Sequence, residues 1–354
     1  MRLRFIPLAV SLVLAGCNCG PGPGGILIFE DTRITAPVTW SGTVEVRNSF
    51  EVAAALTIDR CTKVLMPPGG KITIRDNGSI VTRGTADCPV TLQSGKTTPA
   101  AGDWVGVEVL SSSSNDTRFT HTHFLHGDGE LYGFVWVEGR ATVGFDNVTF
   151  EAMRSSAVQL EPEARVTAFS GVKMIKTGRY VVRAGGDLVG ALEPMTATDT
   201  PEARVQVTSS VTRRAAWKNL GVPLELGSME VTAPLEVAEG SVLKLAPEAV
   251  IGVKDGGGLR LLGTASAPIR LESAKSTPAA GDWRRIDLYS SALADNLFRH
   301  VSVRHGGDSL YGVLWLETGA AVTLEASTFS QNSSCEVGVD GTVTDLGSTF
   351  ARCQ

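Results

Sequence analysis

One long stretch of the chain occurs twice. Residues 98–136 read TPAAGDWVGVEVLSSSSNDTRFTHTHFLHGDGELYGFVW, and residues 277–315 read TPAAGDWRRIDLYSSALADNLFRHVSVRHGGDSLYGVLW. Both ends of the match lie at the same offset, because 277 − 98 and 315 − 136 are each 179. A repeat that stays in register over so many residues is typical of folds in which similar units stack along one axis. The wider copies span about 40–157 and 217–336, and a less regular spacer, 158–216, lies between them.

Apolar residues alternate with other residues in short runs along the whole chain, as in Val44 and Val46, Ile72 and Ile74, or Leu259 and Leu261. This period of two indicates strands with one face inward, and the Gly, Pro, Asn and Asp that end each run keep them short. Short strands suit a sandwich, a barrel or a solenoid, and the duplication and the length favour the solenoid. At roughly 20–25 residues per coil, residues 26–354 make about 13 coils and a rod of about 60 Å.

The repeated motif carries a resemblance to a known group of proteins. Gly-Asp-Trp is followed by a Ser-rich turn, then Phe-x-His, His-Gly and finally Gly-x-x-Trp. This order resembles right-handed parallel β-helix proteins of bacterial surfaces, as does the stretch LKLAPEAVIGVKDGGGLRLLGTASAPIRL before the second motif. The resemblance covers nearly all of residues 26–354 and implies an all-β, right-handed parallel β-helix in a single domain. It implies no particular function, because members of this group have many roles.

The N-terminus predicts an exported lipoprotein. Arg2 and Arg4 precede an apolar run from 5 to 14, which is typical of a secretory signal and too short to span a bilayer. The following Leu-Ala-Gly-Cys resembles a bacterial lipobox, which implies cleavage after residue 16 and lipid on Cys17. An ordinary signal peptide is the alternative. Residues 17–25 form a Gly/Pro-rich tether, and Asn18 favours the outer membrane over the inner one.

The charge of the chain argues against nucleic acid as a partner. Loss of Arg2 and Arg4 would leave 30 basic residues (32 − 2) against 37 acidic ones. Proteins that bind nucleic acid present a basic surface. The remaining expected partners are the membrane, through the lipid, and a glycan or an envelope protein.

Six cysteines in an exported chain suggest disulfides. Cys61 and Cys88 lie in the first copy, and the offset of 179 places Gly240 and Ala267 at the matching positions. The joint loss of both cysteines is expected of a bonded pair. Cys335 and Cys353 would then form a second pair near the C-terminus, and Cys19 is left over in the tether. Reduced, buried cysteines are the alternative.

All five histidines lie in the two matched motifs, where His121 corresponds to His300 and His126 to His305. His121 and His123 are two residues apart, so on a strand they would share a face and, with His126, could hold a transition metal. The second copy has Ser302 in place of the middle histidine. We therefore expect no metal and no cofactor, and interpret these histidines as residues of the coil turns that are also candidates for ligand binding.

The acids and aromatic residues near these turns are the other candidate binding residues: Asp128, Glu130, Tyr132 and Trp136 in the first copy, and Tyr311 and Trp315 in the second. Glycosidases need two acids across the scissile bond, and calcium-dependent sugar lyases need a dense acid cluster. Neither pattern is evident, so we expect no catalytic residues. The acids most worth mutating are Asp128 and Glu130. Asp103 and Asp282, each between Gly and Trp, predict tight turns in which the carboxylate binds backbone amides.

Two functions follow as hypotheses of different classes. The first is a lipid-anchored, non-enzymatic envelope protein that serves in binding, adhesion or structure, because solenoids present long surfaces suited to partners. The second is a polysaccharide lyase or glycoside hydrolase acting on an acidic glycan. Aromatic side chains such as Trp136 suit stacking against sugars in either case.

Overall fold

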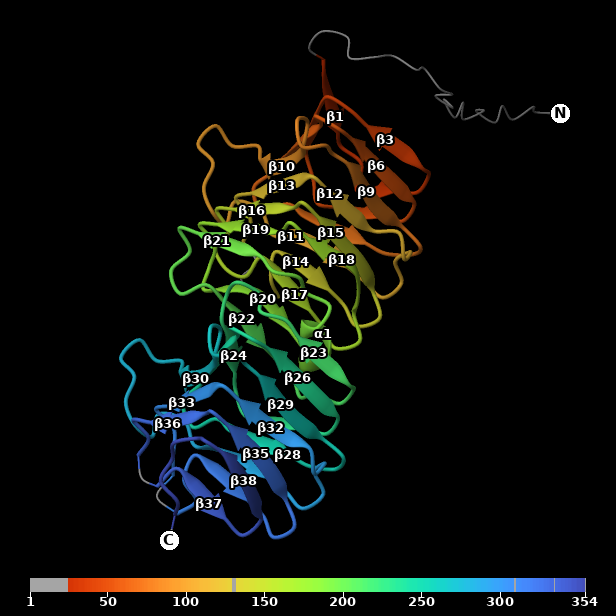
Figure 1. Ribbon diagram of the computed structural model, residues 1–354. Coiled ribbons are helices and arrows are strands. Elements are labelled where there is room, and N and C mark those ends of the chain that lie inside the picture. The colour runs from red at the N-terminus through yellow and green to blue at the C-terminus, as the bar shows by residue number, and fades with distance from the viewer. Residues whose placement is uncertain (1–24, 129–131, 309, 334, 354) are drawn as a thin grey trace, which may run out of the picture.

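The computed structural model describes residues 25–128, 132–308, 310–333 and 335–353. Short strands follow one another along this chain and stack as an all-parallel β-solenoid of about 12 turns, which confirms the predicted solenoid (Figure 1). The coil number is slightly below the predicted 13 because the coils that carry the repeated loops are long. Val107 lies beside Ile72, 35 residues earlier (107 − 72), and Ile286 lies beside Ile251 at the same spacing.

Five sheets form the sides of the rod, and we name them A to E. Sheet A contains β1 (Ile26–Phe29), β4 (Thr43–Val46), β7 (Lys63–Met66), β10 (Val90–Ser94), β13 (Thr122–Leu125), β16 (Thr149–Glu151), β19 (Lys173–Ile175) and β21 (Thr196–Thr198). Sheet B contains β2 (Arg33–Ile34), β5 (Phe50–Val52), β8 (Lys71–Ile74), β11 (Gly106–Val109), β14 (Val135–Val137), β17 (Val158–Leu160), β20 (Tyr180–Ala184), β22 (Arg204–Val207), β24 (Leu224–Leu226), β27 (Val242–Leu245), β30 (Ile269–Ser273), β33 (Val301–Arg304) and β36 (Thr328–Ser330).

Sheets C, D and E complete the rod. Sheet C contains β3 (Val38–Trp40), β6 (Ala55–Asp59), β9 (Ser79–Arg83), β12 (Arg118–Thr120), β15 (Thr142–Asp146) and β18 (Arg165–Ser170). Sheet D contains β25 (Met229–Val231), β28 (Val250–Val253), β31 (Arg285–Leu288), β34 (Leu314–Leu316) and β37 (Val337–Val339). Sheet E contains β23 (Ala215–Trp217), β26 (Pro234–Ala238), β29 (Gly258–Leu262), β32 (Asn296–Arg299), β35 (Ala321–Glu325) and β38 (Thr342–Leu346).

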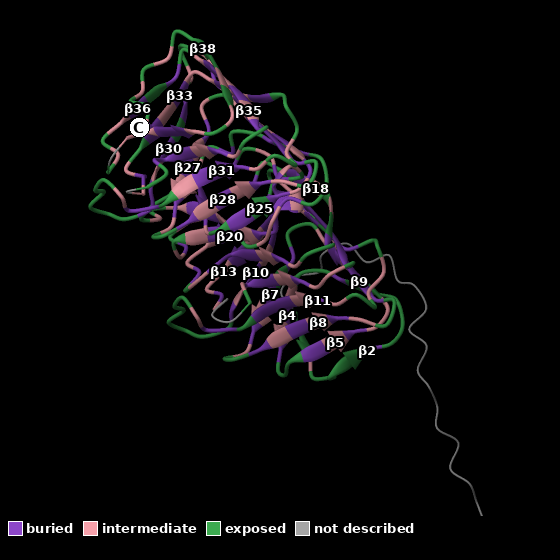
Figure 2. Ribbon diagram, turned by 90° about the horizontal axis from the view of Figure 1, so that it is seen from below, coloured by how far each residue is buried: buried purple, intermediate pink, exposed green. Residues whose placement is uncertain are grey.

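The core runs along the axis of the rod and is filled by the inward residue of each apolar pair. Val44, Val64 and Leu92, on successive coils of sheet A, are fully buried while their chain neighbours face outward. Buried and partly buried residues accordingly alternate along many strands, such as β4 and β8 (Figure 2). Aromatic rings stack from coil to coil in the first copy: the centroids of Phe124 and Phe150 lie 5.3 Å apart in nearly parallel planes. Such contacts add to the burial of apolar area that holds the coils together.

Matching strands of the two copies belong to different sheets. In the first copy the second strand of each coil lies in sheet A and the third in sheet B; in the second copy the matching strands lie in sheets B and D. The change occurs between the end of the spacer and the start of the second copy, where sheet A ends at β21 and sheet D begins at β25. Gly221, at a φ of +76°, follows Leu220 there, and the chain enters β24 without forming a strand beside β21. Sheet B therefore carries the third strand of each coil in the first copy and the second strand of each coil in the second copy.

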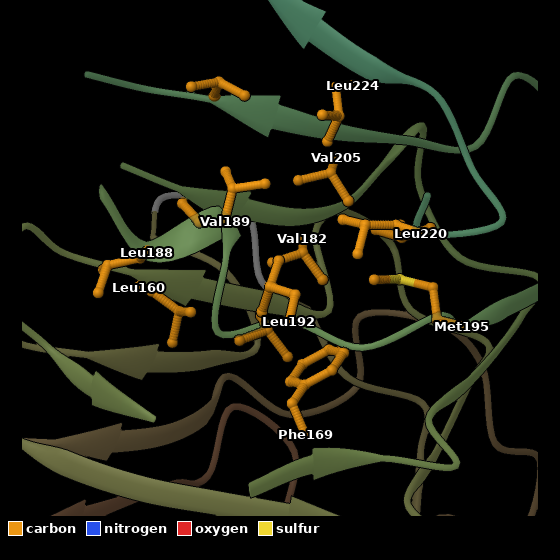
Figure 3. Close-up of a cluster of buried hydrophobic side chains, with 14 of the residues drawn as sticks. Leu160, Phe169, Val182, Leu188, Val189, Leu192, Met195, Val205, Leu220 and Leu224 are labelled. Carbon is orange, nitrogen blue, oxygen red and sulfur yellow. The ribbon is translucent and has the colours of Figure 1, made fainter. Parts of the chain in front are cut away.

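A short helix interrupts the side of the rod formed by sheets C and E. Sheet C ends at β18, sheet E begins at β23, and α1 (Gly186–Val189) occupies the coil between them. Leu188 and Val189 of α1 point into the core, among side chains that include Phe169 and Leu192 (Figure 3). In the described part of the chain, no helix has the length and apolar character needed to cross a membrane.

Candidate functional site

The Gly-Asp-Trp motif builds the same loop in both copies. Its carboxylate accepts a backbone amide bond, as predicted, and also two side-chain bonds that were not predicted. The Asp103 carboxylate accepts hydrogen bonds from Ser94 Oγ at 2.7 Å, Lys96 Nζ at 2.6 Å and the Ala100 amide at 2.8 Å. Asp282 repeats these contacts with its own Ser, Lys and Ala partners. Burial acts to raise the pKa of both aspartates, but these hydrogen bonds outweigh it and lower the pKa, for Asp282 to about 2. Both carboxylates are therefore structural anions of the loops.

Four of the six tryptophans are buried in the core and cannot contact a ligand. Trp40, Trp104, Trp217 and Trp283 are each at most 1% exposed. The indole N–H groups of Trp104 and Trp283 donate to the carbonyl oxygens of Leu125 and Arg304 at 2.8 and 2.9 Å. Trp136 and Trp315, in contrast, lie on outward positions of β14 and β34.

The histidines occupy the corners between sheets. His121, His126, His300 and His305 all have positive φ angles, between 41° and 68°. This left-handed conformation turns the chain between two strands, so the prediction that His121 and His123 share a strand face is wrong. His123 lies on β13 and its Nε2 is 3.0 Å from Glu151 Oε2, whereas His121 lies between β12 and β13.

The rings of His126 and His305 are packed into their corners. Both Nδ1 atoms are buried without a hydrogen-bond partner among the described residues. Burial is the largest influence on His126 and lowers its pKa, which favours the neutral ring near pH 7. Within residues 25–128, 132–308, 310–333 and 335–353, no group of three or more His, Cys, Asp or Glu side chains is arranged to hold a metal ion.

Tyr132 and Trp136 line a hollow on sheet B, which we call the sheet B groove. Its volume is about 440 Å³, and Lys71, Glu108 and Asp128 also line it. The ring centroids of Tyr132 and Trp136 are 5.3 Å apart and tilted by 39°, and Tyr132 is 54% exposed. The groove therefore combines accessible aromatic surface with charged groups, as in many ligand sites. Glu130 lies outside the described residues.

Two glycines keep the floor of the sheet B groove open. Gly106 has a φ of +136° and Gly133 a φ of +92°, conformations that L-residues with side chains rarely adopt. A Cβ atom at Gly106 would collide with the carbonyl oxygen of Phe134, and one at Gly133 would lie 3.0 Å from Gln159 Cβ. The backbone itself thus shapes the hollow beside Trp136.

Fixed polar contacts surround the aromatic rings. Both oxygens of Glu108 accept hydrogen bonds at 3.0 Å, one from Lys71 Nζ and one from Thr73 Oγ1. The indole N–H of Trp136 donates to Glu161 Oε1 at 3.1 Å, which orients the ring. Asp128 lies 3.6 Å from the guanidinium of Arg154. These contacts orient Glu108, Trp136 and Asp128 around the hollow.

The matching position in the second copy is filled. Arg285 replaces Gly106, and its guanidinium lies 4.9 Å from the ring centroid of Tyr311. Arg285 also forms ion pairs with Asp287 at 2.7 Å and Asp308 at 2.6 Å. Burial is the main cause that raises the pKa of Asp287. Trp315 packs on Tyr311 with centroids 5.5 Å apart, on sheet D and not on sheet B.

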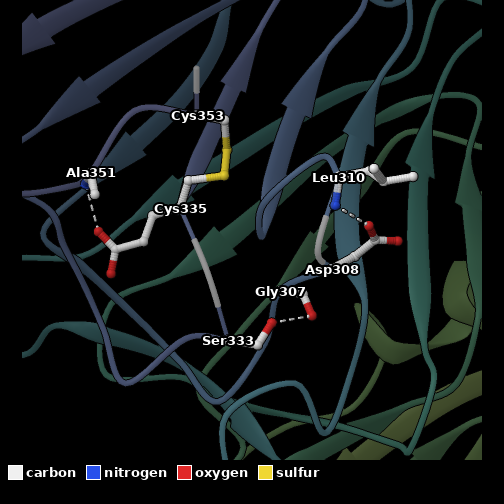
Figure 4. Close-up of a disulfide and its surroundings, with 8 residues drawn as sticks. Gly307, Asp308, Leu310, Ser333, Cys335, Ala351 and Cys353 are labelled. Carbon is white, nitrogen blue, oxygen red and sulfur yellow. Dashed lines mark hydrogen bonds between the residues drawn. A yellow bond between two sulfur atoms is a disulfide. The ribbon is translucent and has the colours of Figure 1, made fainter.

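Both predicted disulfides are confirmed. Cys61 pairs with Cys88 and Cys335 with Cys353, with Cα–Cα distances of 4.7 and 4.8 Å. The second bond lies near the turn that carries Asp308 and Leu310 (Figure 4), and Cys353 Sγ lies close to the backbone of Gly312. Cys17 lies outside the described residues.

A buried ionic cluster between the spacer and the second copy was not predicted. Arg204 and Glu225 are 4% and 7% exposed and pair at 2.7 Å, and Tyr180 donates its hydroxyl to Glu225 at 2.6 Å. The loop of the second copy closes over them, since the Ala274 carbonyl accepts a hydrogen bond from Arg204 at 2.9 Å. In the sequence, Arg204 and Glu225 alternate with apolar residues, which is the pattern of side chains that face outward from a strand. The local sequence therefore gave no indication that they are buried.

Comparisons with family models, curated proteins and solved structures find no match to this chain.

Proposed function

We propose that this chain is a non-enzymatic β-solenoid of the cell envelope that binds a glycan in the sheet B groove. The observation that carries the proposal is the pair of accessible rings, Tyr132 and Trp136, in a hollow of about 440 Å³ with a fixed floor. Aromatic faces stack on the apolar C–H face of a sugar, and a few placed polar groups then fix its orientation. Lys71 and Asp128 are positioned for hydrogen bonds to sugar hydroxyls.

The proposed location of the protein is the cell envelope. The chain would be exported and then anchored to a membrane by lipid on Cys17. The basic start, the short apolar run and the Leu-Ala-Gly-Cys sequence support it. Two disulfides are consistent with an oxidising compartment outside the cytosol. A solenoid tethered by residues 17–25 would hold its grooves away from the membrane surface, within reach of a glycan or an envelope protein.

Catalysis on an acidic glycan has weaker support. Hydrolysis requires one carboxyl group to donate a proton to the leaving oxygen. Both oxygens of Glu108 already accept hydrogen bonds from Lys71 and Thr73, which argues against Glu108 as that proton donor. Binding without turnover therefore explains the arrangement of the groove better.

The test is binding of the full chain to a panel of neutral and acidic oligosaccharides, with new reducing ends assayed in the same samples. Trp136→Ala should weaken the binding free energy of the best ligand by about 2 kcal/mol, which raises its Kd roughly 30-fold, because the substitution removes a central aromatic contact. Trp315→Ala is the matched control, since Arg285 fills the hollow at that position. Unchanged affinity of Trp136→Ala, or turnover that Asp128→Asn abolishes, would contradict the proposal.

A further inference from the structure

A second cleft opens where α1 interrupts the rod. Its volume is about 1010 Å³, larger than that of the sheet B groove. One wall comes from Arg140 and the segment 162–165, at the corners that lead into β15 and β18. The other wall comes from Asp187 of α1 and the segment 209–214, which leads into β23. We call it the arginine cleft.

The backbone itself shapes this cleft. Leu188 and Val189 belong to the buried cluster of the core (Figure 3), and α1 lies where sheet C has ended and sheet E has not yet begun. Gly185 and Gly186 allow the following coil to approach closely: a Cβ atom on Gly185 would lie 2.6 Å from Ser209 Oγ, and one on Gly186 2.9 Å from the Ser209 carbonyl. The hollow is thus set by the packing of α1.

The charge of the cleft is opposite to that of the chain. Arg140, Arg165, Arg213 and Arg214 line it against only Glu163 and Asp187, whereas the whole chain has a formal charge of −5. Arg165 and Arg214 have no ion-pair partner among the described residues. Arg140 pairs with Glu163 at 3.0 Å, but both side chains are largely exposed, so water and salt weaken this pair. Arg213 pairs with Asp187 at 3.3 Å. The two acids thus balance two of the four arginines, and the cleft has unneutralised positive charge.

Asp187 holds the loop that carries two of these arginines. Its carboxylate accepts hydrogen bonds from the Thr212 amide at 2.8 Å, the Thr212 hydroxyl at 2.7 Å and the Arg213 amide at 3.0 Å. Burial acts to raise the pKa of Asp187, but these bonds outweigh it and lower the pKa, so the group stays ionised. Arg213 and Arg214 are thus placed in advance on an ordered turn, which reduces the entropy cost of binding an anion.

We propose that the arginine cleft binds the anionic groups of an acidic oligosaccharide. That the ligand is a glycan rests on the proposed function. That it is anionic rests on the positive charge of the cleft. Guanidinium groups bind carboxylate and sulfate in a two-pronged geometry. Arg165 and Arg214 lie on coils two steps apart, which is about 10 Å along the axis of the rod at the spacing of parallel strands. Two separated cations favour a ligand with repeated charges over a single small anion. The acidity of the remaining chain opposes a nucleic acid.

The test measures binding of the full chain to oligogalacturonate, a sulfated oligosaccharide, a neutral malto-oligosaccharide and a DNA duplex. The double variant Arg165→Gln/Arg214→Gln should weaken binding of the carboxylated or the sulfated oligosaccharide about tenfold or more and flatten its salt dependence. Both side chains are exposed, so a melting curve like that of the parent should accompany the loss. The control is Arg284→Gln/Arg304→Gln, which removes the same charge outside the cleft.

Each remaining outcome counts against a named part of the argument. Equal losses in the test and control variants, or none in either, would overturn the cleft as a site. DNA bound as tightly as the acidic oligosaccharides would overturn the glycan as its ligand. Trp136→Ala without effect on glycan binding, beside a clear loss in the arginine variant, would refute the sheet B groove and leave the arginine cleft standing.

Discussion

Substitution of Asp282 by Asn tests the energetics of the repeated loop. The carboxylate is 6% exposed and accepts bonds from Ser273 Oγ and Lys275 Nζ, both at 2.6 Å, and from the Ala279 amide at 2.8 Å. An amide in its place keeps the size of the side chain but loses the charge and one acceptor oxygen. The loop should then be held less firmly against the coil.

The magnitude follows from the pKa of Asp282, which burial would raise but the hydrogen bonds lower from 3.8 to about 2. A depression of about two units corresponds to about 2 kcal/mol of stability. Because the folded pKa lies below the unfolded one, this stability is present above about pH 4 and is lost as the pH falls towards 2. Asp282→Asn should thus cost about 2 kcal/mol at pH 7, about 3 °C in Tm, and about half of that at pH 3.

The assay is the melting temperature of parent and variant at pH 7 and pH 3. Asp103→Asn, in the matching loop of the first copy, should show a loss in the same direction. Asp295→Asn is the control, since this side chain is mostly exposed and should change Tm little at either pH. A loss from Asp282→Asn that is as large at pH 3 as at pH 7 would refute the reasoning, because the charge would then not be its cause.

Three further predictions concern the core, the disulfides and the anchor. Arg285→Ala leaves the buried Asp287 carboxylate without its nearest cation and should cost about 3 kcal/mol in urea unfolding; its exposed neighbour Arg284→Ala should cost less than about 1 kcal/mol, and equal costs would refute the burial argument. Replacement of Cys61 and Cys88 by Ala should lower stability by about 3 kcal/mol, the entropy of a 27-residue loop, and the difference should vanish when parent and variant are both reduced, because reduction breaks the Cys335–Cys353 bond in both. Cys17→Ser should move the protein from the membrane fraction to the soluble fraction; a variant that still sediments with membranes would contradict lipid anchoring.

Both disulfides and the solenoid followed from the sequence because they depend on spacing along the chain. Strands of period two that recur every 20 to 35 residues can satisfy their backbone only against the next coil. Two cysteines about one coil apart then meet at a similar position on neighbouring coils, as Cys61 and Cys88 do. The histidines show the limit of this reasoning: the left-handed φ of His121 breaks the alternation at a corner, and nothing in its spacing from His123 distinguishes a corner from a strand.

The sheet B groove, the arginine cleft and the buried ionic cluster could not be predicted from the repeat, because they depend on contacts between different coils. By itself the sequence determined that two similar stacks of parallel coils form, because apolar alternation and the offset of 179 act between neighbouring coils. Only the tertiary structure decided which sheet each strand of the two copies joins, because that depends on where sheet A ends, at β21, and where sheet D begins, at β25. The spacer turns α1 inward and opens the arginine cleft, and it buries Arg204 beneath a loop 70 residues later (274 − 204). Burial and charge in the arginine cleft and around Arg204 arise from contacts between segments far apart in the chain. The local sequence pattern therefore does not predict them.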